Sequence, residues 1–369
     1  MTLLDELHER GPVTVATFME LALYHPEFGY YARSDQRSGR AGDFFTSVDV
    51  GPLFGELLEI QFAEFLATLQ ASGFKRQTFD LVEAGAGNGR LAGDILRAAK
   101  RRHPDFYSAV RLHLVEASAA ARAAQLATLG DLADRLTSSS PDLPESFEGV
   151  LIANELLDAM PVHQVVMRED GLREVYVTGC RLDEGPLSTP ALAAHLERLG
   201  VTLEPGWRVE INLRAVDWIR EAARRLRRGF IVIVDYGHEA HALYSASHSA
   251  GTLTTYAGHR SHGVEGPADV PAWLHQPGEQ DITAHVDFTS VRAAAEAEGL
   301  TTIALLDQTY FLLGLYASLS ADEQSTINHA QFKSLVMPGG LGSTHKVLIL
   351  GKGVGKPSLC GCSFSTRLT

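Results

Sequence analysis

The chain contains little cysteine and no long apolar segment. Its three cysteines among 369 residues are an odd number without metal-ligand spacing, which excludes a disulfide framework and indicates a reducing compartment. Its most apolar runs, residues 230–234 and 310–319, are far shorter than the roughly 20 residues that span a bilayer, so we expect no membrane insertion. The N-terminus has acids where a targeting peptide is basic, so we predict a cytoplasmic location.

Positive charge is also scarce. The formal net charge is -13, and basic residues form only short runs such as 100–102 and 224–228. Nucleic-acid binding requires a clustered positive field, so no nucleic-acid partner is expected. The 45% hydrophobic and 21% charged residues are typical of a globular enzyme. The length allows two domains or one α/β domain with insertions, and we favour the second.

The first 74 residues predict an N-terminal helical extension with an active-site loop. Two helical patterns, 15–24 and 52–69, flank a loop at 29–47 that mixes tyrosine, phenylalanine, aspartate and threonine. Pro52 suits the first turn of the second helix.

From residue 78, short apolar runs alternate with helical patterns, which predicts βαβ units and a parallel sheet. We therefore expect an α/β, Rossmann-like domain over 75–351. The expected strands are 78–82, 110–115, 149–153, 230–234, 301–306 and 346–350, and the expected helices are 91–102, 118–129, 213–227 and 291–298.

Two insertions and a tail interrupt or follow this pattern. An insertion at about 160–212 begins with a hairpin of 162–168 and 172–177, because Asp-Gly between them is a strong turn signal. A second, at about 237–288, has little periodicity and predicts a long loop or cap region. Residues 352–369 are rich in Gly, Ser and Lys and predict a flexible tail.

A glycine-rich turn follows the first strand of the sheet. Glu83 ends that strand, and Gly85, Gly87 and Gly89 precede a helix that begins near Arg90. Glycines at alternate positions let the backbone turn sharply and approach a ligand. A dinucleotide fingerprint would need its third glycine at position 90, and a P-loop would need Gly-Lys-Ser/Thr, so both are disfavoured.

Acid-x-Gly-x-Gly-x-Gly is the pattern of class I methyltransferases, in which the turn contacts the methionine and ribose parts of S-adenosylmethionine. A second acid belongs at the tip of the next strand, where it accepts hydrogen bonds from the ribose hydroxyls, and Glu116 has this place. We therefore predict S-adenosyl-L-methionine as the cofactor, with a tight turn that holds no ligand as the alternative. The predicted cofactor-binding residues here are Glu83, Gly85, Gly87, Asn88, Gly89 and Glu116.

A second polar motif follows strand 149–153, whose carboxyl end should lie beside the glycine turn. Asn154, Glu155 and Asp158 are the predicted catalytic residues. Methyl transfer is an in-line displacement that depends on orientation, and paired carboxylates grip a guanidinium well. The alternative is that Asn154 and Asp158 cap a following helix.

Several further polar groups are weaker candidates for a pocket wall. They are His163 and Gln164 at the start of the hairpin, Asp235 at another strand end, and the block 281–288. The block has no His-x-x-x-His or similar spacing, so no metal site is predicted; helix capping explains its end.

An ordered series of segments resembles the family of bacterial MidA-like proteins and the mitochondrial complex I assembly methyltransferase. The resemblance covers about residues 13–350 and implies a class I methyltransferase fold with an N-terminal helical extension and an inserted cap. By the same resemblance, Tyr31, Asp43 and Thr46 close over the cofactor. The matching segments are 18–24, 29–31, 42–47, 54–56, the glycine turn, 154–161, 235–237, 251–253 and 281–283.

Three functions remain open. The resemblance implies a protein-arginine N-methyltransferase acting on a protein such as a respiratory complex subunit. A small-molecule N- or O-methyltransferase is the second reading, and an assembly chaperone that binds the cofactor without turnover is the third. A resemblance to a family supports an inference about the fold more strongly than an inference about the substrate.

Overall fold

The computed structural model describes residues 3–32, 46–73, 77–179, 181–257, 260–262, 271–337 and 341–364. The chain divides into two compact units, each assembled from separate stretches. Unit 1 comprises Met1–Phe45, Leu157–Trp218 and Gly237–Val291, and unit 2 comprises Thr46–Leu156, Ile219–Tyr236 and Arg292–Thr369. The boundaries predicted at 74/75 and 351/352 do not coincide with these divisions and stay predictions.

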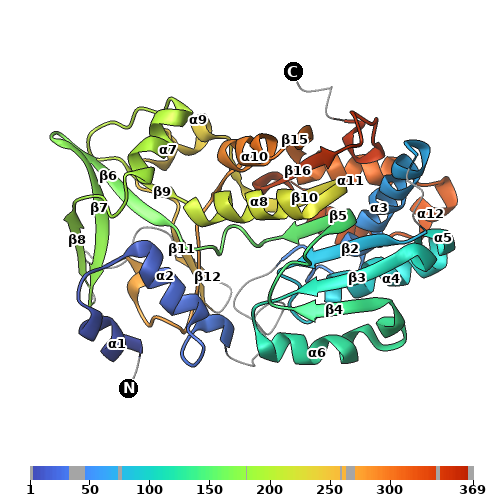
Figure 1. Cartoon of the computed structure of the whole chain (residues 1–369), viewed down its shortest axis with the longest axis horizontal. Helices are drawn as coiled ribbons and strands as arrows, with labels where there is room; N and C mark the ends of the chain where they lie inside the picture. The colour runs from blue at the N-terminus through green and yellow to red at the C-terminus, as the bar shows by residue number, and fades with distance from the viewer. Residues whose placement is uncertain are drawn as a thin grey trace. The chain divides into compact units, whose positions relative to one another are not determined.

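Unit 2 is built on one large sheet with the strand order β15-β16-β10-β5-β2-β3-β4. Strands β4, β3, β2, β5 and β10 are mutually parallel, whereas β16 runs antiparallel to both β10 and β15. Figure 1 shows β5, β2, β3 and β4 side by side. The strands are β2 (Phe79–Ala84), β3 (Val110–Val115), β4 (Leu136–Ser140), β5 (Phe147–Asn154), β10 (Leu226–His238), β15 (Thr301–Asp307) and β16 (His345–Lys352).

The α/β Rossmann-like fold is therefore confirmed, with one strand that is not parallel. Central strands such as β2 and β5 are buried along almost their whole length, which explains why they read as continuous apolar runs. The helices assigned to unit 2, in whole or in part, are α3 (Leu53–Ala71), α4 (Arg90–Arg102), α5 (Pro104–Ala109), α6 (Ala119–Leu129), α8 (Leu213–Arg225), α10 (Phe288–Ala297), α11 (Gln308–Ala317), α12 (Ala321–Thr326), α13 (His329–Val336) and α14 (Leu341–Thr344).

Aromatic packing fixes α3 on the sheet. The rings of Phe65 and Phe230 stack with centroids 3.8 Å apart and planes 10° from parallel. Both side chains are fully buried, and full burial of a large apolar side chain contributes about 1.5–3 kcal/mol. This contact ties the N-terminal helix of unit 2 to the middle of its sheet.

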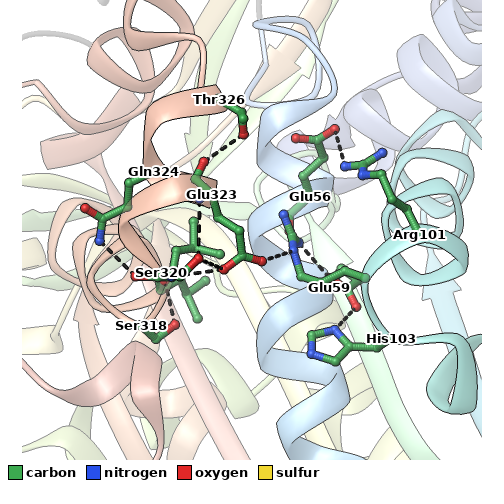
Figure 2. A network of polar contacts seen from close by, with 12 residues as sticks. Glu56, Glu59, Arg101, His103, Ser318, Ser320, Glu323, Gln324 and Thr326 are labelled. Carbon is green, nitrogen blue, oxygen red and sulfur yellow. Dashed lines mark hydrogen bonds and ion pairs between the residues drawn. The ribbon is translucent and has the colours of Figure 1, made fainter.

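A buried charge network joins α3, α4 and α12. The Glu59 carboxylate is completely buried and accepts hydrogen bonds from Arg102 Nη1 at 2.8 Å and from the His103 ring at 2.6 Å. Figure 2 shows Glu59 and His103 in this network, with Glu56 paired to Arg101 beside them. Arg102 also reaches Glu323 of α12 at 3.3 Å. Each buried charge in this layer therefore has an opposite charge in contact, as burial in a protein requires.

The segment after β16 packs on α3, which differs from the predicted flexible tail. Over the described residues, a short turn of 3₁₀ helix at Cys360–Cys362 receives specific contacts. The Cys360 N–H donates to Glu64 at 3.0 Å, and the Gly361 N–H donates to Gln61 at 3.2 Å. A Cβ at Gly361 would lie 2.4 Å from the Phe311 ring. The glycines that suggested flexibility instead permit close packing.

Unit 1 contains the N-terminal helices and two small antiparallel sheets. The predicted helix 15–24 is confirmed, and the predicted hairpin is present as β6 and β7. The elements are α1 (Leu3–Arg10), β1 (Val13–Thr14), α2 (Val15–Tyr24), η1 (Tyr30–Ala32), β6 (His163–Arg168), β7 (Gly171–Thr178), β8 (Arg181–Gly185), α7 (Ala191–Leu199), β9 (Arg208–Ile211), α9 (Ala240–Leu243), η3 (Ala246–His248), β11 (Thr254–Ala257), β12 (Arg260–His262), η4 (Ala272–Leu274), β13 (Asp281–Thr283) and β14 (Val286–Asp287).

The second insertion has more regular structure than its sequence predicted. It contributes the three-stranded sheet β12-β11-β13 and the short strand β14. These strands are two to four residues long, too short to produce a readable periodicity. Among the described helices of both units, none combines the length and apolar character needed to cross a membrane.

Candidate active site

The glycine turn between β2 and α4 uses backbone conformations that favour glycine. The φ angles are 74° at Gly85, 50° at Gly87 and 83° at Gly89, values that side-chain-bearing residues rarely adopt. The N–H groups of Gly85 and Ala86 both donate to the Val115 carbonyl, at 2.9 and 3.0 Å. A Cβ built on Gly87 meets nothing within 4 Å. The turn is therefore anchored to β3 on one side and open on the other.

Glu116 lies at the tip of β3, as predicted, and contacts the turn directly. Its Oε2 accepts the Gly87 N–H at 2.8 Å, and its Oε1 accepts the Ser118 N–H at 2.7 Å. The side chain is only partly buried, so a carboxylate at a strand tip is available for further hydrogen bonds from a ligand.

Two residues that the sequence did not single out also anchor the turn. Gln125 of α6 is fully buried and donates to the Gly87 carbonyl at 2.8 Å. Ser139 of β4 donates to Gln125 Oε1 at 2.6 Å and orients the amide. A lone glutamine inside a helix gives no sequence signal, because only the parallel sheet brings it to the turn.

Glu83 is a buried acid directly before the turn. Burial raises the pKa of Glu83 to about 8, the Ala92 N–H at 3.0 Å opposes this, and the negative charges of Glu116 and Asp94 add to it. Much of the Glu83 population is therefore protonated at neutral pH. A strongly shifted acid beside an open turn is a feature of functional sites.

Asn88 and Thr46 lie at the rim of the turn. Asn88 is exposed, and its Oδ1 accepts the Arg90 N–H at 3.3 Å. Thr46 is nearly buried and donates through its hydroxyl to Asp49 at 2.9 Å, and Asp49 pairs with Arg90 at 3.0 Å. Thr46 is thus linked to the start of α4 through two side chains. Asp43, the third predicted loop residue, lies outside the described residues.

The end of β5 lies beside the glycine turn, as predicted. Ala84 of β2 pairs with Ala153 of β5, and a Cβ at Gly85 would lie 3.1 Å from a Leu156 methyl group. Between them Glu155 has a φ of 50°, a conformation that costs a residue with a side chain about 1–3 kcal/mol. The Glu155 N–H donates to Val234 at 2.8 Å, and the buried Asp235 carboxylate accepts the Leu156 N–H at 3.2 Å. The fold therefore enforces a strained bend that aims Glu155.

The Glu155 carboxylate collects donors from remote parts of the chain. Its Oε1 accepts the Ser47 N–H at 3.1 Å and the Asn154 amide at 3.3 Å, and it lies 3.8 Å from His345 Nε2. The Ser47 hydroxyl in turn donates to Gln308 at 3.2 Å. No helix follows Asn154 before β6, so the alternative that Asn154 and Asp158 are helix caps is wrong.

Asp158 and Tyr31 belong to unit 1, in a buried cluster of acids and tyrosines. Tyr31 donates to Asp281 at 2.9 Å, and Tyr24 donates to the Ala159 carbonyl at 3.0 Å. Burial first, and then the charges of Asp281 and Asp158, raise the pKa of both tyrosines. The structure thus groups Tyr31 with Asp158 and leaves Glu155 in the other unit. The paired action of Glu155 and Asp158, and the closure of Tyr31 over the cofactor, stay predictions.

The weaker candidates have structural partners. His163 contacts Glu174 at 2.7 Å, and the buried Gln164 donates to Glu210 at 2.8 Å. Asp287 accepts the Ser290 N–H at 3.1 Å at the start of α10, as the capping interpretation predicted.

Comparison with known proteins gives a consistent result. Residues 61–306 match the family described as "Putative S-adenosyl-L-methionine-dependent methyltransferase". The chain is 32% identical to the mouse (Mus musculus) "Protein arginine methyltransferase NDUFAF7, mitochondrial", over 84% of this chain and 72% of the relative. The human (Homo sapiens) protein of that name is 31% identical over 80% and 68%. A crystal structure from Burkholderia thailandensis, bound to S-adenosyl-homocysteine, is 30% identical, with a TM-score of 0.85 over 98% of this chain and 94% of that one.

These relatives correct one prediction. The mouse, cattle and human relatives are all named as mitochondrial proteins, so the cytoplasmic location predicted from the acidic N-terminus is wrong. An absent targeting pattern is weak evidence for a compartment, because targeting segments vary far more than the fold that follows them.

Proposed function

Because the chain belongs to this family of S-adenosyl-L-methionine-dependent methyltransferases, we propose that it methylates arginine side chains of a protein. The observation that carries the proposal is the strained Glu155, whose carboxylate is held beside the glycine turn at the end of β5. Strain of this kind persists where the surrounding structure enforces a functional geometry.

The residues of unit 2 fit the cofactor. The space beside Gly87 is open, and a side chain at this position would fill it. Glycine therefore leaves room there for the cofactor. Glu116 at the tip of β3 would accept the ribose hydroxyls, and the turn from Gly85 to Gly89 would lie against the methionine portion. S-adenosylmethionine supplies an electrophilic methyl group when bound. Its positive sulfonium suits a turn that has the partly buried Glu116 carboxylate beside it.

An arginine acceptor suits the carboxylate at Glu155. A guanidinium is planar and positively charged, and a carboxylate binds it through two parallel hydrogen bonds. Glu155 would orient the guanidinium and increase the electron density on the attacking nitrogen, and the adjacent Asn154, which donates to Glu155, would complete this part of the acceptor site. The names of the mouse and human relatives support arginine as the acceptor, and a respiratory complex subunit is the protein substrate that the family resemblance implies.

The test is a search for missing methyl-arginine. A strain that lacks the gene is compared by proteome mass spectrometry with the same strain complemented by the wild-type chain or by Glu155→Gln. We expect one or a few arginine sites to lose methylation in the deletion strain and to regain it only with the wild-type chain. The variant Glu145→Gln, at an exposed position in the same unit, is the matched control and should restore methylation.

Two results would replace the proposal. Transfer of label from S-adenosylmethionine to small molecules and not to protein would establish a small-molecule methyltransferase. Rescue of the deletion strain's growth by Glu155→Gln, with bound cofactor but with no regained methyl-arginine and no labelled product, would support an assembly chaperone.

A further inference from the structure

Three histidines of unit 1 come together from separate segments. His238 ends β10, His248 ends η3, and His285 immediately precedes β14. Their ring centroids are 4.8, 5.3 and 5.7 Å apart. One ring nitrogen from each lies within 4.8 Å of the other two, and each side chain is partly buried.

The backbone holds these positions independently of the rings. Gly237 pairs with Val286, and a Cβ at Gly237 would lie 2.1 Å from the Val286 carbonyl oxygen. Only glycine permits this approach of the two strands, which brings His238 beside His285. The cluster is thus a product of the fold and not of flexible surface side chains.

A hydrogen-bonded scaffold positions the other two histidines. The His248 carbonyl accepts the Gly251 N–H at 2.9 Å, and the neighbouring Thr252 hydroxyl accepts the His285 N–H at 3.1 Å. Thr252 is fixed by the buried Glu210, which accepts its N–H at 2.7 Å and its hydroxyl at 3.0 Å. Such support keeps ligand side chains close to a binding geometry before a ligand arrives.

A hydrogen bond orients the ring of His248 for metal binding. His248 Nδ1 lies 3.0 Å from the Ala242 carbonyl, which can only accept, so Nδ1 carries the proton and Nε2 keeps its lone pair. Histidines that bind a metal through one ring nitrogen usually donate a hydrogen bond from the other, often to a backbone carbonyl.

We propose that His238, His248 and His285 bind one zinc ion. Three imidazoles without a carboxylate favour zinc over calcium or magnesium, which require oxygen ligands. Zinc–nitrogen bonds of about 2.0–2.1 Å place tetrahedral ligands about 3.4 Å apart. The widest pair, within 4.8 Å, would have to close by about 1.4 Å, a movement that side-chain rotation supplies. A fourth position remains for water, and the ion would fasten η3 to β10 and β14.

Zinc titration of the full chain tests the site. Chelator-treated protein is titrated with zinc chloride alone by calorimetry, and with cobalt(II) by absorption spectroscopy. We expect one ion per chain and a cobalt spectrum of tetrahedral nitrogen and oxygen ligation. His248→Ala should weaken zinc binding by at least about 100-fold, more than the loss of a supporting residue costs. The exposed neighbour His241, changed to alanine, is the matched control and should bind as the wild type does.

Thermal melting provides a second measurement. Zinc at roughly 100 times its Kd should raise the Tm of the wild type and of His241→Ala by about 5 °C, and should leave His248→Ala unchanged. Absence of stoichiometric uptake overturns the proposal. Equal uptake by His248→Ala overturns it as well, as does a thiolate-to-cobalt band, which would assign the ion to cysteine.

Discussion

Two buried carboxylates of unit 2 lie in opposite surroundings. Glu59 in the helical layer is completely buried and contacts the Arg102 guanidinium and the His103 ring (Figure 2). Glu83 before the glycine turn is 5% exposed, and the two side-chain charges that shift its pKa, Glu116 and Asp94, are both negative. The fold pairs the buried Glu59 with a cation in the helical layer, and it keeps Glu83 largely protonated before the glycine turn, where we propose that the cationic cofactor binds.

The largest effect should come from closing the open side of the turn. Gly87→Val places a branched side chain at a φ of 50° and in the open space where we propose that the cofactor lies. We expect the Kd for S-adenosylmethionine, measured by calorimetry, to rise by at least about 1000-fold, or about 4 kcal/mol. Gly73→Val, also at a positive φ with open space around it, introduces strain away from the turn and should leave binding unchanged. Unchanged affinity in Gly87→Val would remove the cofactor from this turn.

Breaking the ion pair between Glu59 and Arg102 should lower the stability of the protein and leave its function nearly unchanged. Glu59→Ala leaves Arg102 without its buried partner, and we expect the free energy of unfolding to fall by about 3–5 kcal/mol in urea denaturation. Folded Glu59→Ala should retain cofactor affinity. A loss below about 1 kcal/mol, the size expected for an exposed pair, would mean that the network is not the stabilising element we describe.

Removing the charge of Glu155 should affect turnover alone. Glu155→Gln keeps the size of the side chain, and we expect kcat to fall about 100- to 1000-fold, the range for loss of one group that stabilises a transition state. The cofactor Kd should change less than about threefold. Comparable kcat values for Glu155→Gln and Glu145→Gln, measured on an identified acceptor, would remove Glu155 from the chemistry.

The raised pKa of Glu83 should make the stability of the protein depend on pH. The pKa of Glu83 is raised from 4.5 to about 8 in the folded state, so the folded chain holds a proton that the unfolded chain has released. Between these values stability falls as pH rises, at about 1.4 kcal/mol per pH unit. From about pH 6 to 7.5 the wild type should lose about 2 kcal/mol relative to Glu83→Gln. A constant difference between the two proteins would show that Glu83 does not titrate in this window.

The sequence identified the glycine turn because the turn is contiguous. Gly85, Gly87 and Gly89 stand at alternate positions after an apolar strand, and all three have positive φ. The position of Glu116 could be predicted in the same way, because it directly follows the next strand. Its hydrogen bond with the Gly87 N–H confirms that it lies beside the turn. Backbone geometry of this kind depends on a few consecutive residues, so it can be predicted from the sequence.

Side-chain clusters assembled from distant segments could not be predicted in this way. Ser47 and Gln308 lie 261 positions apart and meet beside Glu155. His238 and His285 are brought together where the end of the long strand β10 pairs with the two-residue strand β14, which is too short to have a readable periodicity. The positions of the three histidines in the sequence therefore gave no indication of a cluster, because the histidines become neighbours only when the strands pair in the folded protein.

The antiparallel strand β16 has a consequence for how the protein is made. It lies between β10 and β15 and pairs with both, although it follows them in the chain. While a ribosome is still synthesising the protein, β10 and β15 therefore emerge with unpaired edges and wait for residues 345–352. Such edges pair readily with other chains, so release of a product that ends before His345 should yield aggregates, whatever the condition of the rest of the sheet.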